Sequence, residues 1–190
     1  MKSLFLALAI VAVIALTACS KTETPPTAAA PAPQAYDLVA ANAKGFTVGA
    51  MMGVNTVYVL FDPQCPHCGH LWNASQPLLA KAKFVWVPVA IINGNSAPQG
   101  AALLSAPNPA EAMTLHEASI LAGTGGTLPR GRTPADLEAI IKKNTELFGS
   151  LNLESVPFLV ARNQQTGQIV SHSGAMDTAS LAQLLGLNAN

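Results

Sequence analysis

Two cysteines separated by two residues follow closely on an apolar run, and this feature constrains the fold more than any other in the chain. The stretch VYVLFDPQCPHCGHLW, residues 57–72, contains Cys65 and Cys68. The run before them is rich in β-branched and aromatic residues and nearly all apolar, as expected of a strand buried on both faces. Cys65 stands where a helix N-cap would, Pro66 suits the first helical position, and apolar residues then recur at helical spacing. The sequence therefore predicts a buried strand that leads into a helix, with the cysteines at the helix N-terminus.

A cysteine pair at a helix N-terminus is typical of a redox-active dithiol. The first turn brings the two sulfurs within bonding reach, with Cys65 outermost and Cys68 beneath it. Free helix N–H groups and the positive end of the helix dipole favour a thiolate at Cys65 and lower its pKa. A thiol of lower pKa is a better leaving group, which shifts the pair toward an oxidant. We expect His67 to be a neutral hydrogen-bond donor to the thiolate and His70 to be a surface residue.

Metal binding and a structural disulfide are the alternative interpretations of the pair. Cys65, Cys68 and one nearby histidine form a ligand set that suits Cu(I). A closed zinc site needs four ligands, and the sequence has no second CxxC and no HxxxH. A structural disulfide would close so small a loop that it would stabilise little. His116 and His172 each stand alone in a predicted helix or strand and are expected to be surface or internally satisfied residues, so we expect neither a metal site nor a cofactor.

The first 18 residues have the pattern of a secretory signal. Lys2 precedes an unbroken apolar run from Leu4 to Leu16, which is too short and too weakly flanked for a convincing spanning helix. The run ends in LTAC, which resembles the lipobox of bacterial lipoproteins, and the only cysteine of the first 64 residues falls at this cleavage point. We expect Cys19 to carry the lipid anchor. Ser20 in the next position resembles lipoproteins that are sent to the outer membrane.

The remainder of the chain divides into a tether and one domain. Residues 19–35 are rich in proline and alanine and have almost nothing to bury, which predicts an extended tether. Residues 36–190 suffice for one domain with a buried sheet and helices on both faces. With Cys19 lipidated, only two cysteines remain, in a compartment where disulfides persist. Ten basic and ten acidic residues, with no basic stripe, exclude a nucleic-acid binder.

Local signals predict the element order β, α, β, helical insertion, β, β, α after a short first helix. Capping patterns at Asn108 and Thr133 each combine a cap, a first-turn proline and an acid. Pro77 should kink the helix that carries the cysteines, and Pro88 should place its strand at an edge or at a point without a ladder bond. The expected elements are helix 35–45, strands 46–49 and 55–62, helix 65–82, strand 84–92, helices within 95–150, strands 157–162 and 168–174, and helix 177–187.

Several of these stretches together resemble a known family. FDPQCPHCGHLW with its preceding strand, WVPVAIING and SVPFLV resemble the bacterial periplasmic thiol:disulfide interchange proteins of the thioredoxin superfamily, in particular the catalytic domain of the DsbC/DsbG group. The likeness covers roughly residues 46–187. It implies an α/β thioredoxin-like fold, a central mixed sheet flanked by helices, with a helical insertion (about 95–150) before the cis-proline strand.

The resemblance also implies roles for individual residues. Cys65 becomes the exposed nucleophile and Cys68 the resolving thiol. The dipeptide Val156-Pro157 matches the cis-proline loop that faces the active site, and the Val156 backbone pairs with an extended substrate strand. Pro66, Val156 and Pro157 are thus the expected substrate-binding residues, and Cys65, His67, Cys68 and Pro157 the expected catalytic ones.

The chain departs from the family pattern at several points. The DsbC/DsbG group has an N-terminal dimerisation domain, whereas about twenty residues separate the tether from the first catalytic strand here, so we expect a monomer rather than a dimeric isomerase. The dipeptide Pro66-His67 and the valine before Pro157 look more like the strongly oxidising DsbA type. Many thioredoxins have a buried acid six residues before the first cysteine, but this chain has Val59, which weakens a thioredoxin-style reductase.

The sequence as a whole predicts a lipid-anchored, periplasm-facing thiol-disulfide oxidoreductase, with the outer membrane favoured as its location. We expect cysteine-containing proteins as substrates and a membrane redox partner. An oxidase is favoured over an isomerase. The alternatives are a reductase of the same fold and a non-enzymatic copper-binding or delivery protein that uses Cys65, Cys68 and a nearby histidine.

Overall fold

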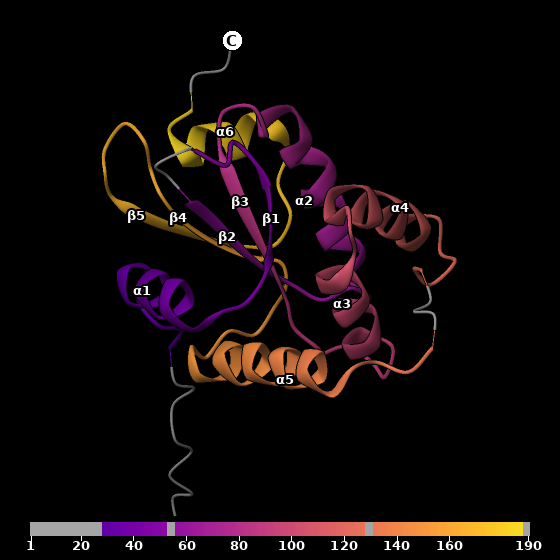
Figure 1. Cartoon of the computed structure of the whole chain (residues 1–190). Coiled ribbons are helices and arrows are strands. Elements are labelled where there is room, and N and C mark those ends of the chain that lie inside the picture. The colour runs from indigo at the N-terminus through magenta and orange to yellow at the C-terminus, as the bar shows by residue number, and fades with distance from the viewer. Residues whose placement is uncertain (1–27, 53–55, 128–130, 188–190) are drawn as a thin grey trace, which may run out of the picture.

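The computed structural model describes residues 28–52, 56–127 and 131–187. They form a five-stranded sheet with helices on both faces (Figure 1). The predicted signal 1–18, Cys19 and most of the predicted tether lie outside the described residues. In chain order the elements are α1 (Ala32–Asn42), β1 (Phe46–Gly49), β2 (Thr56–Phe61), α2 (Pro66–Ser75), the 3-10 turn η1 (Gln76–Leu78), β3 (Lys83–Pro88), α3 (Ser96–Ser105), α4 (Pro109–Leu121), α5 (Ala135–Ser150), β4 (Phe158–Arg162), β5 (Ile169–Ser173) and α6 (Thr178–Leu185).

The sheet is mixed, with strand order β1-β3-β2-β4-β5. Strands β2 and β3 are parallel, and the other three pairings are antiparallel. The central strand β2 is apolar along most of its length, and only Tyr58 is not fully buried. Its neighbours β3 and β4 meet it at Val59, which is opposite Trp86 on one side and Leu159 on the other. The predicted strand buried on both faces is therefore confirmed.

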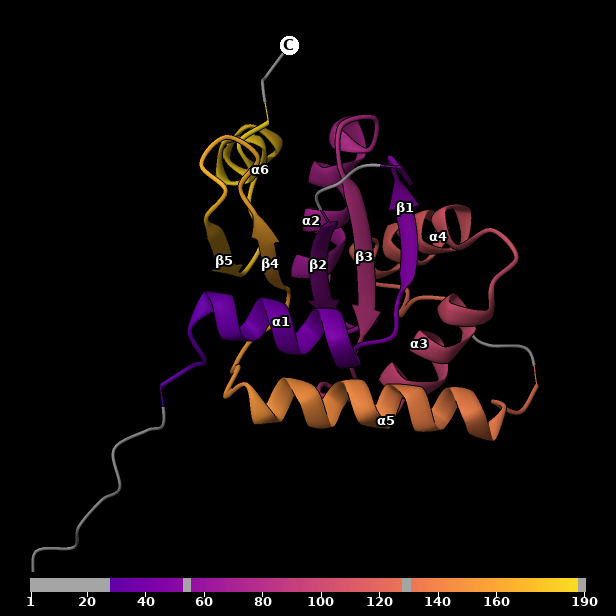
Figure 2. The ribbon, with the colours of Figure 1, turned by 60° about the vertical axis from the view of Figure 1, so that its left-hand side comes forward.

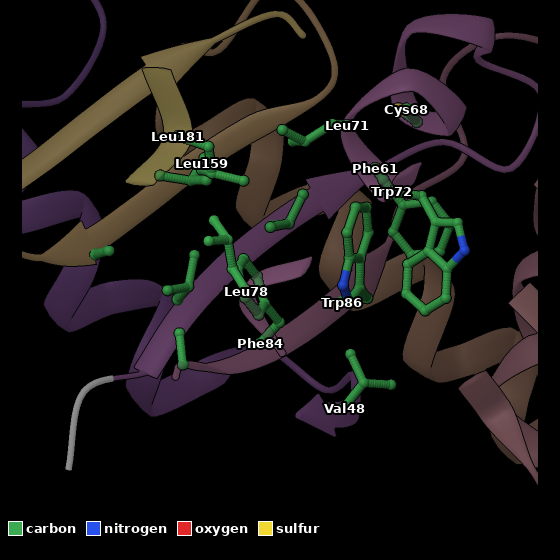
Figure 3. Packing of buried hydrophobic residues seen from close by; sticks show 14 of the residues in the cluster. Val48, Phe61, Cys68, Leu71, Trp72, Leu78, Phe84, Trp86, Leu159 and Leu181 are labelled. Atoms are coloured by element: carbon green, nitrogen blue, oxygen red, sulfur yellow. The ribbon is translucent and has the colours of Figure 1, made fainter. Parts of the chain in front are cut away.

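Each face of the sheet carries its own hydrophobic core. On one face, α2, α4 and α6 pack over a cluster that includes an aromatic group (Figure 3). Within that group the ring of Trp86 meets Trp72 edge to face at 5.2 Å and Phe61 at 5.5 Å. On the other face, α1 and α5 run side by side across the sheet (Figure 2). All the described elements and both cores lie within residues 28–187, so a fragment of residues 28–190 retains the contacts described here.

The predicted helical insertion is present and consists of α3, α4 and α5. The side chain of Asn108 caps α4 as predicted, because its Oδ1 accepts a hydrogen bond from the Glu111 N–H at 3.3 Å. The prediction for Thr133 is wrong. Helix α5 starts at Ala135 directly after Pro134 and has no side-chain cap, since the residue that precedes it is a proline with no side-chain acceptor.

Two helices differ from their predicted bounds. Helix α1 starts at Ala32, so residues 32–35 of the predicted tether are helical. Helix α2 ends at Ser75 and passes into η1, instead of continuing with a kink. Pro77 lacks an N–H and its ring clashes with the carbonyl four residues earlier, which ends the α-helical hydrogen bonding there. No helix in the described ranges has the length and apolar character needed to cross a bilayer.

Strand β3 is shorter than predicted and lies inside the sheet. It ends at Pro88 rather than at Ile92. Strand β1 pairs only with Lys83–Trp86, so Pro88 lies beyond the last β1 pairing, at a point where no ladder bond to β1 is lost. Of the two predicted placements for this proline, the second is confirmed.

A buried amide fastens the insertion to the sheet. The side chain of Asn144 on α5 donates to the carbonyls of Lys44 at 2.8 Å and Pro88 at 3.0 Å, and it accepts from the Lys44 N–H at 3.0 Å. These bonds join α5 to the segment before β1 and to the end of β3. Asn144 is 1% exposed, so water does not replace a lost partner at Pro88.

We predict that Asn144→Ala lowers the free energy of unfolding by about 2 kcal/mol, because it leaves buried backbone groups without partners. Urea denaturation of residues 28–190 followed by circular dichroism measures this. The control is Asn42→Ala, since the Asn42 side chain is exposed and, among the described residues, bonds to the Leu38 carbonyl of its own helix. Equal stability of the Asn144 variant and the wild type would contradict the proposed role of this amide.

Candidate active site at the paired cysteines

The cysteine pair lies where β2 leads into α2, as the sequence predicts. Cys65 is the N-cap residue and Pro66 the first residue of α2. The Cys65 N–H donates to the Asp62 carbonyl at 3.0 Å, and the Cys65 carbonyl accepts from the Cys68 N–H at 3.0 Å. The chain therefore turns tightly after β2 and enters the helix without a linker.

A buried carboxylate that the sequence did not indicate holds this turn. Asp62 is fully buried, and its oxygens accept backbone N–H bonds from Gln64 at 2.8 Å, Ile91 at 2.7 Å and Ile92 at 3.0 Å. The last two belong to the loop after β3. Asp62 thus joins two loops at the same end of the sheet. Its oxygens accept hydrogen bonds from loop N–H groups that have no partner on a neighbouring strand.

Side chains of the insertion hold the same turn from the other side. His116 on α4 donates from Nε2 to the Pro63 carbonyl at 2.7 Å and accepts at Nδ1 from the Thr127 N–H at 3.1 Å. Both ring nitrogens of His116 therefore have hydrogen-bond partners inside the protein, which is one of the two predicted states of this residue. Burial lowers its pKa. Gln64 donates to the side chain of Gln99 on α3 and to the Gly125 carbonyl. The loop before the cysteines is thereby bonded to α3, to α4 and to the loop after α4.

The Cys65 thiol faces the loop that precedes β4. Its sulfur donates to the Val156 carbonyl at 3.5 Å, and the Val156–Pro157 peptide bond is cis, as the resemblance implies. The structure corrects one expectation: Cys65 is not exposed, because only 4% of its surface is accessible beside the Val156 loop. Cys68 is completely buried, and no disulfide joins the two sulfurs in this structure.

The two sulfurs have opposite pKa shifts. The pKa of Cys65 is lowered to about 7, chiefly because the Cys68 thiol donates a hydrogen bond to it, against the effect of burial. Backbone N–H groups of Cys68 and His67 lower it further, and the negative charge of Asp62 raises it. Burial is the main reason that the pKa of Cys68 lies well above its ordinary value. Near neutral pH the thiolate of the pair therefore forms on Cys65 and not on Cys68.

The predicted hydrogen bond from the His67 ring is not found. His67 is exposed, and its contribution to the Cys65 thiolate comes from its backbone N–H. Its ring lies 6.3 Å from the ring of His70, which is exposed as expected. In the parts of the chain that the structure describes, no three His, Cys, Asp or Glu side chains are grouped so that they could hold a metal ion.

A second buried acid next to the cysteines was also missed. Glu117 on α4 is completely buried, and its pKa is raised to about 9, mainly by burial and then by the charges of Cys65 and Asp62. The sequence indicates this acid only through its position. Glu117 lies between Met113 and Ile120 on the apolar side of a helix, where an acidic residue is unusual.

Comparison with known proteins finds no matching family model but two curated relatives. The chain is 32% identical over 133 residues to the thiol:disulfide interchange protein DsbG of Pseudomonas aeruginosa, which covers 68% of this chain and 50% of that protein. It is 29% identical over 107 residues to the DsbG protein of Escherichia coli, with 53% and 41% covered. The chain thus spans about half the length of the curated relatives that it matches.

Solved structures show the fold. The catalytic domain of Proteus mirabilis ScsC superposes with a TM-score of 0.62 over 81% of this chain and 94% of that domain, at 17% identity. A periplasmic thioredoxin-like protein from Salmonella enterica serovar Typhimurium superposes with a TM-score of 0.60 over 80% and 94%, at 14% identity. The predicted thioredoxin-like fold is confirmed.

We predict that iodoacetamide modifies Cys65 and not Cys68 in the reduced native protein at neutral pH. Because the lowered pKa gives more thiolate, the rate at Cys65 should rise through pH about 7 and level off above it. Peptide mapping by mass spectrometry over a pH series measures both sites. Unfolded protein is the control, since both thiols then titrate near the ordinary value. Equal modification of the two native cysteines would contradict the assignment.

Proposed function

We propose that this chain, a member of the thioredoxin superfamily, is a periplasm-facing thiol-disulfide oxidoreductase that acts on cysteine-containing proteins through Cys65 and Cys68. One observation carries the proposal: a thiol with a pKa of about 7 lies at the N-terminus of α2, against a cis-proline loop, beside a second thiol that is completely buried. The similarity to the DsbG proteins supports disulfide interchange as the chemistry.

The reaction begins from the Cys65–Cys68 disulfide. A substrate thiolate attacks the Cys65 sulfur; a bond forms between these two sulfurs, the Cys65–Cys68 bond breaks, and its electron pair goes to Cys68. A second substrate thiolate then attacks the first substrate sulfur and expels Cys65 as a thiolate. The low pKa of Cys65 makes it the better leaving group. The substrate gains a disulfide, the pair is reduced by two electrons, and a membrane redox partner reoxidises it.

The cis-proline loop supplies the binding site for the substrate backbone. In the reduced protein the Val156 carbonyl accepts a bond from the Cys65 thiol. An extended substrate that pairs with the Val156 backbone brings its own sulfur to Cys65. Around this point Pro66 is exposed, and so are the apolar side chains of Ile91 and Ile92, on the loop that Asp62 holds beside the cysteines. An exposed apolar rim suits a flexible, incompletely folded polypeptide.

We propose the oxidising direction. The dipeptide Pro66-His67 and the residue Val156 resemble the strongly oxidising type, and Val59 in β2 is a buried apolar side chain where many thioredoxins have an acid. One observation favours a reductase instead: a pKa of about 7 at Cys65 matches thioredoxin and lies well above that of the strongest oxidant of the superfamily. We therefore propose an oxidase of moderate strength, not a dimeric isomerase. A monomeric mass by light scattering is part of this proposal, and a dimer would overturn that part.

Location is a separate part of the proposal. The LTAC pattern at residues 16–19 and Ser20 support lipidation at Cys19 and delivery to the outer membrane. Residues 19–35, with α1 from Ala32 onward, would connect the anchor to the folded domain.

We predict that Cys19→Ala moves the protein from the membrane fraction to the soluble periplasmic fraction, because it removes the only acylation site of the pattern. Fractionation of cells that express the full chain measures this, with Ser20→Ala as the matched control. A Cys19 variant that stays in the membrane fraction would show that another segment anchors the protein.

We predict that oxidised residues 28–190 form a disulfide in a reduced two-cysteine peptide, and that the two cysteine variants fail differently. For the variants the peptide is supplied in excess in its disulfide form: in reduced Cys68→Ser, Cys65 attacks one peptide sulfur, the other peptide sulfur leaves as a thiolate, and the mixed disulfide accumulates because no Cys68 thiol releases Cys65, whereas Cys65→Ser should form none. Mass spectrometry after acid quenching measures both species. Adduct formation at Cys68 in the Cys65 variant would contradict the assigned order of attack.

Equilibration of the same protein with glutathione buffers measures the direction. A reduction potential well above that of thioredoxin supports the oxidase, and one near or below it selects the reductase. Absence of a reversible two-electron transition would overturn both.

A further inference from the structure

The carboxyl group of Glu117 is buried and titratable, and no hydrogen bond from the described residues holds it in place. The residue is completely inaccessible, and neither of its oxygens has a hydrogen-bond partner within the described residues. Its neighbour on α4, His116, is fully engaged with Pro63 and Thr127. A buried carboxyl that satisfies no hydrogen bond costs stability and does not hold elements together. Such a group in contact with a reactive site points to a chemical role.

Packing between α2 and α4 puts this carboxyl group against the cysteine turn. A methyl group at Gly69 would lie 2.8 Å from Glu117 Oε2, so only a glycine after Cys68 leaves room for the acid. Gly69 is also one turn beyond Cys65, whose carbonyl accepts the Gly69 N–H. The Glu117 charge acts on Cys68, and the Cys65 charge acts on Glu117. The carboxyl group therefore packs against the first turn of α2, near enough to the cysteines for its charge to raise the pKa of Cys68.

We propose that Glu117 is the proton donor to the Cys68 sulfur when a substrate thiolate opens the Cys65–Cys68 disulfide. This inference rests on the proposed function. As the bond between Cys65 and the substrate sulfur forms, the Cys65–Cys68 bond breaks and its electron pair goes to Cys68. The proton of the Glu117 carboxyl group passes to that sulfur, which leaves a Cys68 thiol and a Glu117 carboxylate. In the reverse direction the carboxylate takes the proton back before Cys68 attacks.

The proton affinities of the two groups fit this transfer. The pKa of Glu117, raised to about 9, keeps the carboxyl group protonated at neutral pH. Burial raises the pKa of Cys68 well above its ordinary value, so the nascent thiolate in this apolar site readily takes up a proton. Without a donor, the leaving sulfur would carry an unpaired negative charge in an apolar site. Val59 provides no acid from β2, and α4 of the insertion supplies one instead.

The titratable groups that face Glu117 are few. They are Asp62 in the turn after β2 and the two cysteines at the start of α2. The neighbouring α3 and β1 contain no titratable residues. In the oxidised protein the cysteines carry no charge, so burial and Asp62 still hold the pKa of Glu117 above its usual range.

The test is the reduction of oxidised residues 28–190 by excess dithiothreitol, with the rate constant divided by the fraction of dithiothreitol present as thiolate. For the wild type this normalised constant should fall as pH rises through the pKa of Glu117, because the donor loses its proton. For Glu117→Gln it should be about 100-fold lower at neutral pH and independent of pH. Glu117→Asp, which keeps the acid, should restore part of the rate and the pH dependence.

The matched control is Glu111→Gln, which removes an exposed acid from the first turn of the same helix and should behave like the wild type. A wild-type constant that does not change with pH, or a Glu117→Gln variant with the wild-type profile, would overturn the inference while leaving the proposed function intact. Failure of the wild type to form or exchange the Cys65–Cys68 disulfide would instead overturn the proposed function. If Glu117→Gln does not fold, the wild-type profile and Glu117→Asp still decide the question.

Discussion

The buried carboxylate of Asp62 is the interaction on which the rest of the site depends. Its three hydrogen bonds to backbone N–H groups tie the turn before the cysteines to the loop after β3. That geometry fixes where α2 begins, and hence where Cys65 meets the helix N-terminus. The same negative charge raises the pKa of Cys65 and of Glu117. Asp62 thus positions the site but disfavours a thiolate at Cys65. The hydrogen bond from Cys68 lowers the pKa of Cys65 by more than Asp62 raises it.

The helical insertion helps to build the candidate active site as well as adding to the fold. Helices α3 and α4 bond to the turn before Cys65 through Gln99 and His116. Helix α5 reaches the opposite face, where Asn144 joins it to the end of β3. The insertion therefore holds the sheet end that carries the cysteines from two sides. It also buries an acid beside the cysteines that the central strand does not supply.

The strands and the cysteine turn follow from the sequence, because each depends on local patterning or on a motif within a few residues, whereas the cis-proline position follows from the resemblance to a known family. The contacts that complete the site do not. His116 meets Pro63, and Asp62 meets Ile91, across long stretches of chain, and nothing local distinguishes these residues from surface ones. Burial of Cys65 likewise depends on how the Val156 loop packs. Exact helix ends were missed where prolines intervene, at Pro77 and Pro134.

The recessed position of Cys65 has a consequence for the timing of its action. Only 4% of the surface of Cys65 is accessible and its sulfur bonds to the Val156 carbonyl, so under the proposed function a thin extended strand reaches it more easily than a cysteine fixed on a rigid folded surface. Under the proposed function, a substrate protein then reacts or not according to how far it has folded, rather than according to its residue types. Once a substrate protein has folded, the strand that carries its cysteine can no longer enter beside the Val156 loop. Completion of the substrate fold therefore ends the exchange without any separate signal.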